Sequence, residues 1–339
     1  MLCCPKCFNH RFLQDFIKAN STKTGKCSFC FSTSTLTKCD PSVLIDLFQP
    51  VFDLYAESSA GIFLNEQLQS DWKIFHKNLS ATQQQKLITR IASDKKYSTL
   101  KVISRHTHDT TYINKWERFK DELQHENRFF PKNAIDTTQL KDLLGYLALG
   151  KEGNPQYIYR ARVNRSTKPY PIAEMGKPPK EKTLDGRANP KGIPYFYGAS
   201  DEKTAIAETR PYKSEFISVA KFKLNRKAKI IDIRDPQNTI TPFGLDDDSL
   251  ALLYKEHMPF LGHLCAALSK PVLPHKKDLE YLPTQYLCEL IKDTNFDGIA
   301  FKSSLGKGDN YVIFNDSLLT GSKVSTYSIA STIVKSVKV

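Results

Sequence analysis

The stretch from Asp185 to Glu208 combines an arginine, a loop rich in glycine and proline, a short aromatic segment and a glutamate. Residues 185–192, DGRANPKG, predict a tight loop, because glycine reaches positive φ and proline fixes its own φ. A cationic loop beside a carboxylate can hold an anionic substrate while the carboxylate stabilises positive charge that develops elsewhere on it. A surface loop next to a salt-bridged glutamate would have the same composition. Residue types alone leave both interpretations open.

The neighbouring residues predict the elements that would bring these groups together. The segment 193–197, IPYFY, is β-branched and aromatic and is typical of a strand. Ser200 or Asp201 can cap a helix that runs to the glutamate. We therefore expect Arg187 on a loop, Tyr197 at a strand end, and the glutamate buried on a helix that faces back toward them.

Two CxxC pairs near the N-terminus form a second group of chemically active side chains. Their cysteines are Cys4, Cys7, Cys27 and Cys30. Four thiolates at this spacing can close a tetrahedral zinc site, and a segment of about 30 residues has too little core to fold otherwise. Disulfides are the alternative, although a cytosolic compartment disfavours them. Cys3 and Cys39 lie close by in the sequence and could replace a ligand. We predict a structural zinc ribbon, which could bind nucleic acid or protein or cap a neighbouring domain.

Length and composition limit the class of protein. The chain has 339 residues, of which 40% are apolar and 25% charged, and this is typical of a globular protein with two or three domains. We find no signal peptide and no apolar run of about 18 residues, so we expect a cytoplasmic protein without a membrane segment. The net charge of +13 favours anionic partners, which include nucleic acid, acidic proteins and nucleotides.

Residues 40–150 have the apolar spacing of helices. The first predicted helix follows Asp40 and continues through Tyr55, with a kink expected at Pro50. A capping box at Ser80 begins the second helix. The third and fourth helices are predicted at 113–130 and 140–147.

The second half of the chain alternates between strands and helices. A linker at 151–155 comes first, and residues 166–182 predict a mobile loop because they are rich in proline and lysine without periodicity. Further helices are predicted at 247–268 and 283–294. The predicted strands are 157–163, 216–224, 229–233, 299–301 and 310–314. Strands at both ends with helices between them indicate an α+β fold, and no GxGxxG motif of a Rossmann fold is present.

Five blocks of this half, taken in order, carry a family resemblance. They read YIYRARV, GRANPKGIPYFYGAS, TAIAETRP, YLPTQYLCELIK and FDGIAFKSSLGKGDNYVIF. Together they cover residues 156–314 and closely resemble the RES domain, a family named for its Arg, Glu and Ser whose members cleave NAD as toxins of bacterial toxin–antitoxin pairs. The resemblance implies a catalytic domain similar to ADP-ribosyltransferases, with a split, mostly antiparallel sheet and NAD in the cleft.

The same resemblance implies roles for individual side chains. Arg160 and Arg187 match the family's two arginines, which are expected to bind the diphosphate or an incoming phosphate. Glu208 matches the family glutamate, which would stabilise the oxocarbenium character of the ribose as the N-glycosidic bond breaks. Tyr197 matches a site tyrosine that would stack on the nicotinamide or position the ribose.

Four further positions are implied with less definite roles. Ser303 matches the family serine and would supply a hydroxyl to an anion, although Ser304 is adjacent and fits nearly as well. Asn310 matches a substrate-binding position. Ala161 follows the first arginine where some members carry an aromatic residue, so stacking on nicotinamide would depend on Tyr159 or on the site tyrosine.

The helices between the cysteine ribbon and the RES-like half resemble the HEPN-like N-terminal domain of some RES proteins. HEPN ribonucleases use an arginine followed a few residues later by a histidine, and Arg118 and His125 fit this pattern. Many charged helices match it by chance, so we expect a structural or partner-binding role. His106 and His108 beside Asp109 are typical of a solvated loop.

The sequence therefore predicts a zinc ribbon at 1–39, a helical domain at 40–150, a catalytic domain at 151–325 and a tail at 326–339. We expect an NAD phosphorylase or glycohydrolase that releases nicotinamide, with structural zinc and with phosphate as a candidate co-substrate. It would act as a toxin in a toxin–antitoxin or anti-phage setting, as an oligomer held by an antitoxin or regulatory protein. The alternative is a nucleic-acid-binding or ribonuclease-type protein that uses its basic N-terminal half and carries a vestigial RES half.

Overall fold

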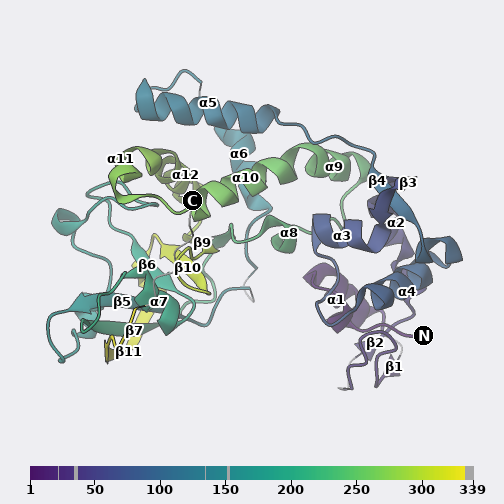
Figure 1. Ribbon diagram of the computed structural model, residues 1–339, viewed down its shortest axis with the longest axis horizontal. Coiled ribbons are helices and arrows are strands. Elements are labelled where there is room, and N and C mark those ends of the chain that lie inside the picture. Colours follow the sequence, from purple (N-terminus) through teal and green to yellow (C-terminus); the bar gives the residue numbers. More distant parts are fainter. Residues whose placement is uncertain (22, 34–36, 134, 151–152, 333–339) are drawn as a thin grey trace. The chain divides into compact units, whose positions relative to one another are not determined.

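The computed structural model describes residues 1–339 except 22, 34–36, 134, 151–152 and 333–339 (Figure 1). The chain divides into two compact units. Unit 1 comprises Met1–Tyr112 and Pro236–Phe260, and unit 2 comprises Ile113–Asp235 and Leu261–Val339. Over the described residues, no helix is both long and apolar enough to cross a membrane.

Unit 1 contains short helices and two small antiparallel sheets. Its helices are α1 (Arg11–Ala19), α2 (Ile45–Asp53), α3 (Leu64–Trp72), α4 (Ala81–Ala92), α8 (Pro236–Thr239) and α9 (Asp247–Leu252). Its strands pair as β1 (Lys23–Thr24) with β2 (Thr37–Lys38) and β3 (Tyr55–Phe63) with β4 (Lys101–Ser104). The capping box predicted at Ser80 is present at the start of α4.

The pairing of β3 with β4 was not predicted, because the apolar spacing of the preceding helix continues to Tyr55. Instead α2 continues past Pro50 and ends at Asp53. Tyr55 then begins a strand with a register shift between Glu57 and Ile62. At Gly61 a Cβ atom would lie 2.1 Å from a backbone oxygen of β4, so only glycine fits this close approach.

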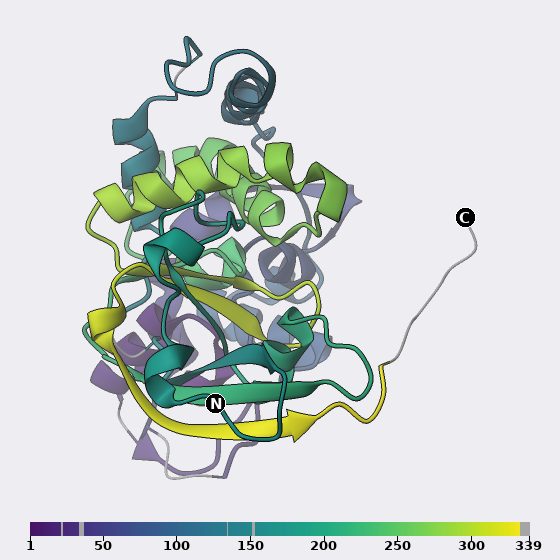
Figure 2. The same ribbon diagram turned by 90° about the vertical axis from the view of Figure 1, so that its left-hand side faces the viewer.

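Unit 2 is organised around a seven-stranded sheet. In spatial order its strands are β11 (Leu319–Ser328), β7 (Phe216–Leu224), β5 (Tyr157–Asn164), β6 (Phe196–Ala199), β10 (Asp309–Ile313), β9 (Gly298–Lys302) and β8 (Ile230–Asp232). The pair β8–β9 is parallel, and the other neighbours are antiparallel. Figure 2 shows β11 lying along β7 at the edge of the sheet. The predicted mostly antiparallel α+β fold is confirmed.

Unit 2 also contains α6 (Thr137–Gly145), α7 (Glu202–Glu208), α11 (Lys277–Glu280) and α12 (Leu282–Asp293), and most of α5 (Thr111–His125) and α10 (Met258–Ser269). The residues after α6 extend the sheet, since the Leu149 amide donates to the Ile230 carbonyl at 2.8 Å. The boundary between the two compact units therefore does not fall at residue 150, the predicted end of the helical domain. The division of the chain into four domains stays a prediction.

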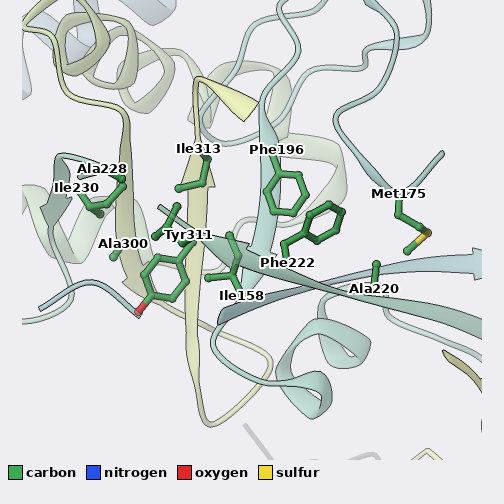
Figure 3. Close-up of a cluster of buried hydrophobic side chains, with 11 residues drawn as sticks. Ile158, Met175, Phe196, Ala220, Phe222, Ala228, Ile230, Ala300, Tyr311 and Ile313 are labelled. Atoms are coloured by element: carbon green, nitrogen blue, oxygen red, sulfur yellow. The ribbon is translucent and has the colours of Figure 1, made fainter. Parts of the chain in front are cut away.

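The alternation of the strands separates a core face from a second face. Phe196 and Phe222 pack edge to face with ring centroids 4.8 Å apart, within a cluster that includes Ile158 and Tyr311 (Figure 3). Because successive side chains of a strand point to opposite faces, the neighbouring residues lie on the other face. In register across four strands, these are Tyr159, Ala199, Asn310 and Phe301.

Several predicted boundaries change. The strand expected at 193–197 begins at Phe196. The loop at 166–182 contains two short 3₁₀ turns and is anchored in the core by the fully buried Met175. The predicted tail begins inside β11 and its last part, 333–339, lies outside the described residues, as do residues 151–152 of the linker.

Candidate active site

A cavity of about 470 Å³ lies in unit 2 and is lined in part by residues of the sheet strands β5, β6, β9 and β10. This volume is in the range of small-molecule sites. Seven of the eight side chains predicted to act on the substrate line it: Tyr159, Arg160, Arg187, Tyr197, Glu208, Ser304 and Asn310. The structure thus gathers residues that are up to 151 positions apart in the sequence.

Glu208 is the last residue of α7, a helix whose first turn is capped by Asp201, as predicted. Its Oε1 atom accepts hydrogen bonds from the Ser303 hydroxyl at 2.6 Å and from the Asn310 amide at 2.7 Å. The expectation of burial is wrong, because this carboxylate is exposed. It is held through one oxygen, and within the described part of the chain no hydrogen bond to Oε2 is found.

Ser303 does not line the cavity, whereas Ser304 does. The Ser303 hydroxyl donates to Glu208 and accepts from the backbone N–H groups of Leu305 and Gly306 at 3.1 and 2.7 Å. A hydroxyl engaged in this way orients the carboxylate and closes the loop after β9. The predicted contact between Ser303 and an anion therefore stays a prediction.

Arg187 projects from the loop that precedes β6. Its Nη1 donates to the Leu268 carbonyl at the end of α10 at 2.7 Å, and its guanidinium lies 5.8 Å from the ring centroid of Tyr281. Burial lowers the pKa of Arg187, while the nearby Glu208 acts in the opposite direction. A guanidinium has five N–H donors, so most of its donor capacity is available to a ligand.

Arg160 belongs to β5 and lines the same cavity. Its Nη1 donates to the Tyr197 carbonyl at 3.0 Å, and its guanidinium lies 5.2 Å from the ring centroid of Phe196. Burial, together with repulsion from Arg162, lowers the pKa of Arg160 to about 10, so the side chain remains cationic at neutral pH. Its Nε atom is buried and has no partner among the described residues. Arg162 is exposed and binds the Glu174 carbonyl, in agreement with the solvated role expected for it.

Tyr197 lines the cavity, and its hydroxyl contacts the loop that carries Arg187, residues 185–192, which we call the arginine loop. The hydroxyl donates to Asn189 Oδ1 at 2.6 Å and accepts from the Ala188 amide at 3.2 Å. Burial raises the pKa of Tyr197, which keeps the phenol neutral. Stacking on nicotinamide by this ring or by Tyr159 stays a prediction.

Sequence reasoning missed several other residues of the site. The cavity is also lined by Arg210, Lys277, Tyr281 and Lys302. Lys277 lies 3.6 Å from Asp185, and Lys302 lies 3.8 Å from Asp235. Lys277 is about 90 positions from Asp185 in the sequence, so no local pattern could predict the contact between these two residues. The ionisable lining thus has five cationic side chains and one carboxylate, which favours an anionic ligand.

The four predicted cysteine ligands come together in unit 1. The sulfur atoms of Cys4, Cys7, Cys27 and Cys30 all lie within 4.8 Å of one another. Tetrahedral zinc with bonds of about 2.3 Å places its sulfur ligands about 3.8 Å apart, so the set can hold a metal ion. Cys3 and Cys39 instead face each other, with their sulfurs 3.8 Å apart across a β-bridge. In the parts of the chain that are described, this is the one cluster suited to a metal.

The HEPN-like residues and the histidine loop form no comparable site. Arg118 and His125 are exposed on α5. The Asp109 carboxylate accepts from the Thr111 amide at 2.7 Å, and the His108 ring lies 5.3 Å from the ring of Tyr254. These contacts are typical of a helix start and of aromatic packing.

The structure thus has an α+β domain with a cavity of small-molecule size and mostly cationic ionisable lining. A comparison with known families matches residues 158–330 to the RES domain, and this chain belongs to that family. Toxins of the family cleave NAD. Among solved structures, the chain is similar to one from a crystal structure of the M. tuberculosis MbcT–MbcA toxin–antitoxin complex, at 10% identity and a TM-score of 0.35, over 57% of this chain and 93% of that chain. A search of curated proteins gives no match.

Proposed function

We propose that this protein cleaves the N-glycosidic bond of NAD and releases nicotinamide. The observation that supports the proposal is the cavity in which Glu208, held through one oxygen, lies with Arg160 and Arg187. NAD carries both kinds of charge that this arrangement suits, since its diphosphate is anionic and its nicotinamide ring is cationic. Membership of the RES family supports the same substrate.

Arg160 and Arg187 would bind the diphosphate. Each guanidinium is fixed by a hydrogen bond to a backbone carbonyl, so its orientation is set before the ligand arrives. Each also packs over an aromatic ring, which limits its motion without consuming its donors. Preorganised guanidinium groups can form the paired hydrogen bonds that phosphate oxygens accept.

Glu208 would act on the ribose. As the bond between the ribose carbon and the nicotinamide nitrogen breaks, the electron pair leaves with nicotinamide and positive charge builds on the ribose. A fixed carboxylate stabilises this charge more in the transition state than in the ground state. Ser303 and Asn310 would keep the carboxylate in place through Oε1, and Oε2 would act on the ribose.

An oxygen nucleophile then bonds to the ribose carbon. Water would give ADP-ribose, and inorganic phosphate would give ADP-ribose 1″-phosphate. The excess of cationic side chains in the cavity supports phosphate as an acceptor, because NAD itself carries only one net negative charge. Both acceptors complete the same bond cleavage.

The cysteine cluster would hold structural zinc. Its donors are four sulfurs, which match the ligand preference of zinc in closed structural sites. Three of the four cysteines are buried and the fourth is half-buried, which leaves little access for a substrate. We assign this metal to the stability of unit 1.

In a cell this activity would make the protein a toxin, because loss of NAD stops metabolism. An antitoxin or other regulatory partner would be needed to restrain it, and a phage-triggered role is compatible with the same chemistry. A cytoplasmic location and an oligomeric state are part of the proposal.

Incubation of the purified chain with NAD, with and without phosphate, tests the proposed function. We expect nicotinamide in amounts that exceed the amount of protein, and a phosphorylated ADP-ribose product when phosphate is present. NAD that remains intact in both mixtures, with salt-sensitive binding of nucleic acid instead, would support the non-enzymatic alternative.

A further inference from the structure

The loop that carries Arg187 is fixed by side chains from the first turn of α12, to which sequence reasoning assigned no role. The Gln285 side-chain amide donates to the carbonyls of Gly186 and Asn189 at 2.9 and 3.1 Å. One neutral side chain therefore holds the backbone on both sides of the arginine. Gln285 is itself buried, so water does not compete for these bonds.

Two neighbours of Gln285 act on the arginine itself. The Thr284 hydroxyl lies 2.7 Å from the Arg187 carbonyl and shares its proton with the Tyr281 carbonyl at 2.9 Å. The Tyr281 ring lies under the guanidinium. Residues 281–285 thus contact the side chain and the carbonyl of Arg187 and the peptides that flank it, and we call them the α12 clamp.

The opposite side of the loop is equally restrained. The Tyr197 hydroxyl binds Asn189, and the Gly186 amide donates to the Asn189 carbonyl at 2.9 Å. A Cβ atom at Gly186 would lie 2.6 Å from both the Tyr197 hydroxyl and the Asn189 side-chain oxygen. The backbone of the loop therefore packs directly against these two groups, with no room for a side chain at this position. The backbone of the loop is therefore determined by β6 on one side and by the α12 clamp on the other.

We propose that Gln285 and Thr284 are positioning residues, which place the Arg187 guanidinium where it binds the anionic part of the ligand. This inference rests on the proposed function for its kinetic readout, but it makes a separate statement about how affinity is produced. An arginine on an unrestrained loop would have to lose conformational freedom on binding, and the clamp removes this cost before the ligand arrives.

Isosteric substitutions test the proposal. Gln285→Met keeps the volume and removes both donors, and Thr284→Val keeps the shape and removes the hydroxyl. We expect each to raise the Michaelis constant for NAD, and the dissociation constant for ADP-ribose, by about fivefold to tenfold, with Gln285→Met the larger because it loses two bonds. Turnover at saturating NAD should change by less than about twofold, because the affected contacts are made in ground and transition states alike.

Matched variants separate positioning from general stability. Thr284→Ser keeps the hydroxyl and should restore affinity close to that of the wild type. Thr294→Val removes a similar hydroxyl bond, to the Ile291 carbonyl, at the other end of α12 and should leave affinity unchanged. In an Arg187→Ala background, Gln285→Met should produce no further loss of affinity, because the two changes act through the same guanidinium.

The outcomes distinguish this proposal from the proposed function. If the wild-type chain binds ADP-ribose but leaves NAD intact, the proposed function fails while the dissociation constants still test the clamp. If it binds no ADP-ribose, both fail. If the wild-type chain is active but Gln285→Met lowers only the melting temperature, or its effect adds fully to that of Arg187→Ala, the clamp is structural support and the proposal is overturned.

Discussion

The cysteine cluster of unit 1 and the arginine–glutamate cavity of unit 2 both gather polar groups, but they use them in opposite ways. The cysteine sulfurs face one another, so their bonding capacity is directed inward. In the cavity, Arg187 and Arg160 each make one guanidinium hydrogen bond to a backbone carbonyl, and Glu208 is bonded through one oxygen, among the residues that the structure describes. Inward-directed groups indicate a stabilising role, whereas groups with unused capacity at the wall of a cavity indicate a ligand.

The comparison is tested most strongly by removing one ligand of the proposed zinc site. Cys7→Ser should reduce bound zinc from one per chain to none, and it should unfold the N-terminal segment, because structural zinc contributes on the order of 10 kcal/mol to small folds. Metal analysis and thermal melting would measure both effects. Cys3→Ser is the control, since Cys3 faces Cys39 outside the cluster, and it should retain zinc. If the wild-type chain is folded and metal analysis finds no bound zinc, the assignment is wrong.

Loss of the Glu208 charge should cause the largest effect on catalysis. Glu208→Gln should lower turnover by about 100- to 1000-fold, or roughly 3–4 kcal/mol, and should change NAD affinity much less. Glu202→Gln is a matched control at the start of the same helix, where the carboxylate binds Tyr327 away from the cavity. A Glu208→Gln enzyme with nearly normal turnover would show that the carboxylate has another role.

Arg187 should affect binding more than turnover. Arg187→Ala should raise the Michaelis constant for NAD by about 10- to 100-fold, because hydrogen bonds to charged groups contribute more than neutral ones. Arg187→Lys should restore little, since an ammonium cannot reproduce the paired donors of a guanidinium. Initial rates at limiting and saturating NAD separate the two constants. If Arg187→Ala lowered turnover and left the Michaelis constant for NAD unchanged, the assignment of Arg187 to the diphosphate would be contradicted.

The two adjacent serines offer a finer test. Ser303→Ala removes a 2.6 Å hydrogen bond to Glu208 and should lower turnover by about tenfold or more. Ser304→Ala alters only the cavity wall and should act weakly, mainly on affinity. Equal effects of the two variants on turnover would show that Ser303 does not act through the carboxylate.

The smallest effect on activity is expected from substitutions on α5. The double variant Arg118→Ala and His125→Ala changes two exposed side chains and should leave nicotinamide release within about twofold of the wild type. Cell toxicity should persist with it. If toxicity disappeared while NAD levels still fell, the ribonuclease alternative would be favoured.

Local signals predicted much of the fold. The strand at 216–224 was predicted at its observed limits, since its β-branched and aromatic residues are typical of a strand. The cap at Asp201 and the helix to Glu208 also follow from adjacent residues. The cysteine set could be predicted because its ligands come in two short repeats. In each case the information lies within a few residues.

The remaining features depend on contacts between distant segments. The bonds from Ser303 and Asn310 to Glu208 join residues about 100 positions apart, and they exist because β10 pairs with β6. No local pattern reports that pairing. Tyr197 was expected to stack on nicotinamide or to position the ribose, and the bond from its hydroxyl to Asn189 was not predicted. The α12 clamp was present in the sequence as YLPTQYL, yet only the fold brings it to the arginine loop.

The central claim is that the guanidinium groups and the carboxylate of one cavity act on two adjacent parts of the same NAD molecule, its diphosphate and its nicotinamide-bearing ribose. A crystal structure of the Glu208→Gln variant with intact NAD tests it most directly, because slow turnover would preserve the substrate. The account predicts the diphosphate on Arg160 and Arg187, and the nicotinamide-bearing carbon of the ribose beside residue 208. A diphosphate bound away from both arginines, or a ribose remote from residue 208, would contradict it.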